Sequence, residues 1–228
     1  MARIFCFTKF VFPKPTNFSY FAMAKDLYNR KQLDELYAQL SVKEGISRYN
    51  FVLRNELQTG DLIFLSGNHW FSRLIQWRSK SAWSHVGMVL RVDEIERTFL
   101  IESVIDNGVR LIPVSSIFSD YDGDGKSYKG RVLWARHRGL TIEDEKVLRE
   151  SSIELLTKQY DGKEFLRIAW RSVTGREKLL TDDKFTCAEL VHYCFLKAKI
   201  RLNYDRGFFI SPGSVWRNEK VEMMGILL

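Results

Sequence analysis

The chain has 228 residues, which suits one large domain, and its 45% of hydrophobic residues argue against global disorder. The net charge of +7 favours an anionic partner, but the Lys and Arg residues are scattered along the chain, so no nucleic-acid partner is expected. Three cysteines, Cys6, Cys187 and Cys194, are too few for a disulfide framework.

Residues 1–50 are interpreted as an N-terminal extension with a helix, which Leu residues at helical spacing predict within residues 22–42. The Phe-rich, basic start lacks a small-residue cleavage site, and Lys9 interrupts its apolar stretch, so the signal-peptide pattern is weak. A loose or core-docked arm is the plainer interpretation, although this composition also suits a membrane surface. No apolar run is long enough to span a membrane, and a cytoplasmic setting is favoured.

Residues 51–228 are predicted to form a single domain. A turn at Gly60 and Asp61 leads into a short buried strand, LIFL, and then into a helix over residues 69–79. Four β-rich segments follow, separated by turn residues: SHVGMVLRV, TFLIESV, VRLIP and RVLWARH. This pattern predicts an antiparallel sheet or a small barrel.

Helices return after the β-rich middle of the chain. Thr141 is a predicted N-cap, with acidic residues in the first turn of a helix that runs to about residue 158. A second helix is expected over about residues 161–172, and a third begins at Cys187. Because strands and helices are segregated along the chain, the predicted fold class is α+β.

The third helix carries the first candidate catalytic residue. Thr186 is followed three residues later by Glu189, a capping-box pattern that makes Cys187 the first helical residue. Unpaired backbone N–H groups and the helix dipole at such a position stabilise a thiolate and can hold an oxyanion. The alternative is that Cys187 is an ordinary core residue, because it shares a helical face with Leu190, Val191, Cys194 and Ala198.

A thiol nucleophile needs a base, and His85 is the candidate. His85 opens a strand whose residues Val86, Met88 and Leu90 face the other way, although a structural histidine at an edge is the plain alternative. Glu102 lies in the next, otherwise apolar strand, and a hairpin between the two strands would bring it near His85 to orient the imidazole. A solvent-facing carboxylate is the alternative for Glu102.

Five short motifs, GDLIFLSG, SHVGMVL, LIES, YDGKEF and FTCAELV, occur in an order that resembles the YaeF/YiiX-like group of permuted papain-like amidases in the NlpC/P60 superfamily. The resemblance covers roughly residues 57–200. It implies a circularly permuted papain-like (NlpC/P60) fold, with a small antiparallel sheet or barrel packed against helices. The family usually has Ser after the Cys, where this chain has Ala188.

The same resemblance implies roles for individual residues. Cys187 matches the nucleophile, His85 the general base, and Glu102 the residue that orients the base. Tyr160 resembles a Tyr near the nucleophile that helps to polarise the scissile carbonyl, and Asp61 matches a residue that fixes a turn. No cofactor and no metal are implied.

The leading hypothesis is a cysteine hydrolase that cleaves an amide or ester in a cell-wall peptide or a lipid-linked acyl substrate. The first alternative is a phospholipid-dependent acyltransferase or lipase of the lecithin:retinol acyltransferase-like type, which the Phe-rich basic N-terminus would suit. The second is a non-catalytic papain-like module that binds a ligand or a protein. Peripheral contact with a membrane or cell wall fits all three.

Other residues have plainer interpretations. Asp120, Asp122 and Asp124 resemble the start of a calcium loop, but Arg131 stands at its twelfth position, so a solvated turn is favoured. His69 lies in a loop, and His137, among cations, is expected to be exposed. Three tryptophans precede His85 and suit either a substrate cleft or, more usually, the core: Trp70, Trp77 and Trp83.

Overall fold

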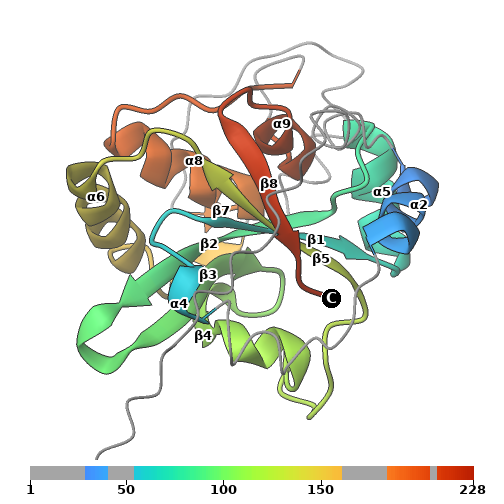
Figure 1. The fold of residues 1–228 in the computed structure, drawn as a ribbon, viewed down its shortest axis with the longest axis horizontal. Coiled ribbons are helices and arrows are strands. Elements are labelled where there is room, and N and C mark those ends of the chain that lie inside the picture. The colour runs from blue at the N-terminus through green and yellow to red at the C-terminus, as the bar shows by residue number, and fades with distance from the viewer. Residues whose placement is uncertain (1–28, 41–53, 161–183, 206–209) are drawn as a thin grey trace, which may run out of the picture.

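The computed structural model describes residues 29–40, 54–160, 184–205 and 210–228 (Figure 1). The helix predicted over residues 161–172 lies outside these ranges. The elements in chain order are α2 (Arg30–Leu40), α4 (Arg54–Glu56), β1 (Leu62–Gly67), α5 (Trp70–Ser79), β2 (His85–Val92), η2 (Asp93–Ile95), β3 (Arg97–Val104), β4 (Gly108–Pro113), η3 (Val114–Phe118), β5 (Gly130–His137), α6 (Ile142–Ile153), β6 (Gln159–Tyr160), β7 (Lys184–Phe185), α8 (Cys187–Lys197), α9 (Pro212–Trp216) and β8 (Val221–Ile226).

Six antiparallel strands form the main sheet, in the order β4-β3-β2-β1-β5-β8. The predicted mixture of helices and antiparallel sheet is therefore confirmed. The sequence left open whether the strands form a sheet or a small barrel. The described strands follow a linear order in which β4 and β8 are the two ends. Strand β8 was not among the predicted elements, and it pairs with β5 across a register shift between Trp134 and Ala135.

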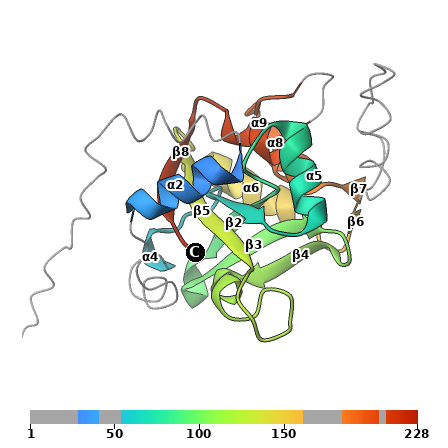
Figure 2. The ribbon, with the colours of Figure 1, turned by 90° about the vertical axis from the view of Figure 1, so that its right-hand side faces the viewer.

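The two faces of the sheet bear different covers, which Figure 2 shows above and below it. Alternate strand residues such as Phe64 and Met88 join the helices α2, α6, α8 and α9 in one core cluster. Their neighbours, such as Leu65 and Val89, pack against η3 and the segment after it in a second cluster. The period-two alternation of strand side chains thus gives each face its own core.

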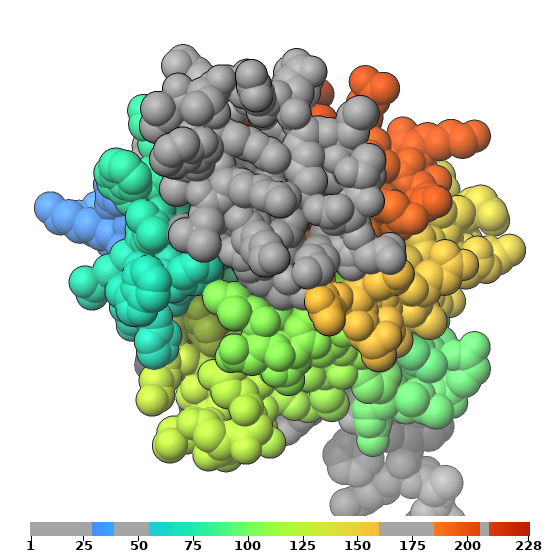
Figure 3. All heavy atoms as spheres, turned by 180° about the vertical axis from the view of Figure 1, so that it is seen from behind, coloured from blue at the N-terminus to red at the C-terminus, as the bar shows by residue number. Residues whose placement is uncertain are grey.

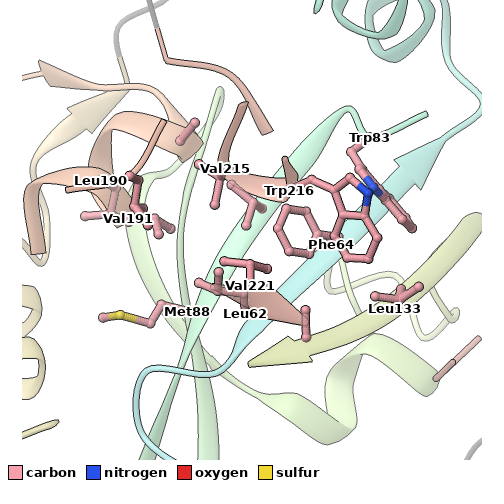
Figure 4. Packing of buried hydrophobic residues seen from close by; sticks show 14 of the residues in the cluster. Leu62, Phe64, Trp83, Met88, Leu133, Leu190, Val191, Val215, Trp216 and Val221 are labelled. Carbon is pink, nitrogen blue, oxygen red and sulfur yellow. The ribbon is translucent and has the colours of Figure 1, made fainter. Parts of the chain in front are cut away.

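Three aromatic rings of the larger cluster pack against one another (Figure 4). Phe64 lies with its centroid 5.6 Å from that of Trp83 and 5.1 Å from that of Trp216, and the two indoles are 5.4 Å apart. Such tilted and edge-on pairs add to the burial of large apolar rings. Trp83 is therefore a core residue, in contrast to Trp70 and Trp77, which are exposed.

Helix α2 belongs to the stretch interpreted as an extension, yet its buried residues join the larger core cluster. Tyr37 donates a hydrogen bond of 2.7 Å to the carbonyl of Val132 in β5. Arg30 donates one of 2.6 Å to the carbonyl of Ser66 at the end of β1. These bonds attach α2 to the sheet as well as to the core.

Helix α6 ends at Ile153, so the prediction that it runs to about residue 158 was wrong. Thr141 does cap it, in a full capping box with Asp144. The early end has a tertiary reason, because the chain turns toward β4 at this point. Thr157 adopts a φ of 71°, its N–H donates to the carbonyl of Val109, and the N–H of Val109 donates to the carbonyl of Lys158.

Candidate active site

Cys187 is the first residue of α8, as its sequence context predicted. The hydroxyl of Thr186 accepts a hydrogen bond from the N–H of Glu189, and the Glu189 carboxylate accepts one from the N–H of Thr186. This capping box satisfies the amide of the third helical residue. The amides of Cys187 and Ala188 lie in the first turn, where an α-helix offers no internal acceptor.

The base of the helix is secured to the sheet at two points. Ser103 of β3 donates a hydrogen bond of 2.6 Å to the carbonyl of Phe185, two residues before Cys187. Beyond Cys187, Ala188 and Val191 are buried in the same cluster as Val86 and Met88 of β2. The Cys187 residue itself is only 5% exposed. Its position is therefore set by β2 and β3, the strands that carry the other two candidate residues.

His85 and Glu102 lie diagonally across neighbouring strands. The register pairs Met88 with Ile101, and its continuation sets Glu102 opposite Gly87. The imidazole Nε2 lies 2.7 Å from the Glu102 Oε2. A carboxylate can only accept, so Nε2 carries the hydrogen and Nδ1 is left to face another partner.

Glu102 is fully buried, and its carboxylate accepts hydrogen bonds from three side chains, those of His85, Arg110 and Tyr121. Arg110, its cross-strand neighbour in β4, donates from Nε at 2.9 Å to Oε1, which also lies 2.7 Å from the Arg110 Nη2. Tyr121 donates its hydroxyl hydrogen at 2.8 Å to the same oxygen that His85 contacts. The solvent-facing alternative for Glu102 is thus wrong.

Arg110 and Tyr121 were both missed from the sequence. One signal could have predicted Arg110. It is an isolated cation in the strand GVRLIP, and pairing this strand with β3 places it directly opposite the Glu102 carboxylate. Its guanidinium also lies 4.9 Å from the centroid of the Tyr121 ring. Tyr121 is 19 residues from Glu102 in a turn-rich loop, and no local pattern predicts that contact.

The electrostatics couple these groups. Burial alone lowers the pKa of His85. Cys187 and Glu102 each act on it through their charge and a hydrogen bond, and together they raise this pKa to about 10. Burial alone raises the pKa of Glu102, but His85, Arg110 and Tyr121 together lower it. At neutral pH this arrangement favours an imidazolium between an anionic carboxylate and the Cys187 sulfur.

Tyr160 is adjacent to the site through its backbone. It pairs with Phe185 in the short parallel sheet of β6 and β7, two residues before Cys187. Its side chain lies outside the described part of the chain, so its role near the scissile carbonyl stays a prediction.

The remaining candidates are distributed elsewhere. Cys194 is buried, and burial raises the pKa of its thiol to about 12. His137 was expected to be exposed, but it is only 3% exposed and packs edge-on against Phe195, so that prediction was wrong. The neighbouring cations suggested an exposed position, but His137 pairs with Val221 of β8 in the sheet and its ring contacts Phe195 of α8. Asp61 accepts hydrogen bonds from the N–H of Gln58 in its turn and also from Trp134 and Arg136.

The acidic loop folds as a turn that presents Tyr121. Asp120 accepts from the N–H of Gly125, and Asp124 accepts from the N–H and the ammonium of Lys126. In the described ranges, no three His, Cys, Asp or Glu residues are grouped so that they could hold a metal ion. Within the same ranges, no helix has the length and apolarity to cross a membrane.

Comparison with known proteins adds to this geometry. The family model for the permuted papain-like amidase enzymes YaeF/YiiX, the C92 family, matches residues 56–208. Among solved structures, that of metalloprotein YiiX from Escherichia coli O157:H7 has a similar fold, with a TM-score of 0.55 and 20% sequence identity over 74% of this chain and 97% of that chain. No curated protein matches. With well over half of its length matched by that family model, this chain belongs to the permuted papain-like amidases of the C92 family, an enzyme family of the cysteine-peptidase type.

Proposed function

We propose that the protein is a cysteine hydrolase in which Cys187 is the nucleophile, His85 the general base and Glu102 the residue that orients the base. The observation that carries this proposal is the hydrogen-bonded chain from Arg110 and Tyr121 through Glu102 to His85, whose pKa is raised by its interaction with Cys187. A histidine held by a buried carboxylate beside a thiol at a helix start is the arrangement that thiol hydrolysis requires.

The reaction divides into two steps. His85 already holds, at Nδ1, the proton taken from the Cys187 thiol, and the thiolate sulfur attacks the substrate carbonyl to form a tetrahedral oxyanion. The amides of Cys187 and Ala188, with Tyr160 as a further candidate, hold the negative oxygen. His85 returns its proton to the leaving amine, and the acyl group stays on the sulfur. Water, deprotonated by the same imidazole, then hydrolyses the thioester and regenerates the thiol.

The proposed substrate is a carbonyl compound of the peptide or lipid-linked acyl kind, and amide cleavage is favoured because the family is described as amidases. We also propose the wider placement in the permuted NlpC/P60 superfamily, which the motif order supports. The neighbour in the fold comparison is described as a metalloprotein. The reaction proposed for this chain uses its own side chains, and no step is assigned to a metal.

The first test is the rate at which iodoacetamide alkylates Cys187 between about pH 4 and 9, measured by mass spectrometry, a range that brackets the ordinary thiol pKa. Cys194 in the same molecule is the internal control, because its thiol is buried away from the site. Fast labelling of Cys187 at neutral pH, lost in His85→Ala, is expected. A labelling rate that matches an ordinary thiol and is unchanged in His85→Ala would contradict a catalytic role for Cys187 and His85. It would favour the non-catalytic binding module.

The second test separates the substrate classes. The protein is incubated with peptide amides and, separately, with phospholipid, and the mass of the Cys187 peptide is followed. Release of amine from a peptide amide, abolished in Cys187→Ala, supports the hydrolase. An acyl group that accumulates on Cys187 from phospholipid, without any amide cleavage, would replace it with the acyltransferase.

A further inference from the structure

Helix α5 presents an aromatic and basic face to solvent that the site chemistry does not use. Trp70 is 76% exposed and Trp77 is 75% exposed, although large indoles are usually well covered. Seven residues make almost two full turns, so these two side chains lie on one line about 10 Å apart along the helix. Arg73, also exposed, lies between them on the helix, and the exposed Lys80 is the C-cap residue that follows the last turn.

The opposite side of α5 is held firmly by the protein. Gln76 is buried and donates hydrogen bonds to the Ser66 hydroxyl at 3.1 Å and to the Gly67 carbonyl at 3.3 Å. At the end of the helix, the carbonyls of Ser79 and Lys80 accept hydrogen bonds from Arg217. The exposed face is therefore presented by a helix of defined orientation, and Figure 3 shows the α5 region, in teal, at the surface of the molecule.

The charge of this face indicates its partner. The segment from residue 70 to residue 80, WFSRLIQWRSK, contains three cations and no carboxylate, and the whole chain carries a net charge of +7. Indole rings prefer the boundary between apolar and aqueous phases, and cations beside them attract anionic head groups. We propose that the face formed by Trp70, Arg73, Trp77 and Lys80 docks on an anionic phospholipid surface.

Docking by this face would also orient the candidate active site. Five residues separate the end of α5 from His85, and Ser84 in this connection accepts a hydrogen bond of 3.0 Å from the N–H of Gly67. The connection is therefore short and secured to β1. The docking does not depend on the chemistry of Cys187, so Cys187→Ala is expected to bind vesicles as the unmodified chain does.

Cosedimentation of the full chain with phospholipid vesicles tests this surface. The vesicles are phosphatidylcholine alone, or phosphatidylcholine mixed with phosphatidylglycerol. Binding is expected only with the anionic mixture. Trp70→Ala with Trp77→Ala is expected to weaken it at least about tenfold, since binding scales with the apolar area inserted. Arg73→Gln with Lys80→Gln is expected to weaken it about fivefold for each cation removed.

Matched controls lie on α6, where Ile142 and Lys146 are likewise exposed. Ile142→Ala and Lys146→Gln are expected to bind as the unmodified chain does, and thermal unfolding checks that every variant is folded. Three results would overturn the proposal: no binding to anionic vesicles, binding that the α5 variants leave unchanged, or equal loss in the α6 controls. Retention on peptidoglycan that depends on Trp70 and Trp77, without vesicle binding, would assign the face to the cell wall instead.

Discussion

At the scale of single residues, the charge on Glu102 governs the behaviour of His85. Glu102→Gln keeps the shape but removes the charge that helps to raise the pKa of His85, so that pKa falls. We expect hydrolysis to slow by about 100-fold or more, as for loss of an oriented base. The alkylation rate of Cys187 is measured against pH. The part of that curve that depends on protonated His85 is expected to end at a lower pH than in the unmodified chain.

Tyr121→Phe is the comparison for that variant, because it removes one hydrogen bond to Glu102 and leaves the carboxylate charge in place. A stability loss of about 1–2 kcal/mol is expected from the lost buried hydrogen bond, with a smaller change in the alkylation profile. If the two variants shift the profile equally, the charge of Glu102 is not the controlling quantity.

His192 makes stability depend on pH. Burial lowers its pKa to about 4, and its Nε2 lies 2.5 Å from the Tyr204 hydroxyl. In the unfolded chain the imidazole takes up a proton below its ordinary pKa of about 6.5. The contribution of His192 to stability is therefore fully present above about pH 6.5 and falls between this pH and about 4, by up to about 1.4 kcal/mol per pH unit.

Urea unfolding at several pH values measures this slope. His192→Gln is expected to show a shallower slope over the same range. Some slope remains, since burial and Lys220 also lower the pKa of His137. An unchanged slope in the variant would assign the pH dependence to other groups.

At the scale of elements, two capping boxes provide a matched pair. Thr186 caps α8 and Thr141 caps α6 with the same hydrogen-bond pattern. Replacing either threonine by alanine is expected to lower the free energy of unfolding by about 1 kcal/mol. Only Thr186→Ala is expected to slow the alkylation of Cys187, because only that cap orders the amides beside the sulfur. Slowing of the same size in Thr141→Ala would make the effect one of general stability.

At the scale of the whole molecule, α2 tests how far the domain extends toward the N-terminus. Leu36 is buried in the cluster that also contains the sheet and α8. Leu36→Ala is expected to lower the free energy of unfolding by about 2–5 kcal/mol, with one cooperative transition. An early, separate transition of small amplitude would instead mark α2 as an independent extension.

The sequence by itself determined the elements whose signals are local. Alternating apolar residues set the faces of β2 and β3, and the Thr-x-x-Glu and Thr-x-x-Asp patterns set the starts of α8 and α6. Each of these signals depends on residues within one helical turn or one strand, so all the interacting groups lie in one short segment of sequence. Cys187 at a helix start and His85 at a strand start were readable for the same reason.

Only the tertiary structure decided which distant groups meet. Four features depend on how distant elements pack: the contact of Glu102 with Tyr121, the burial of His137 against Phe195, the early end of α6 toward β4, and the exposure of Trp70 and Trp77. No short window contains both partners of such a contact. The energies of these long-range contacts depend on burial and on which polar groups pair. Both are defined only after the sheet and its two covering layers have come together.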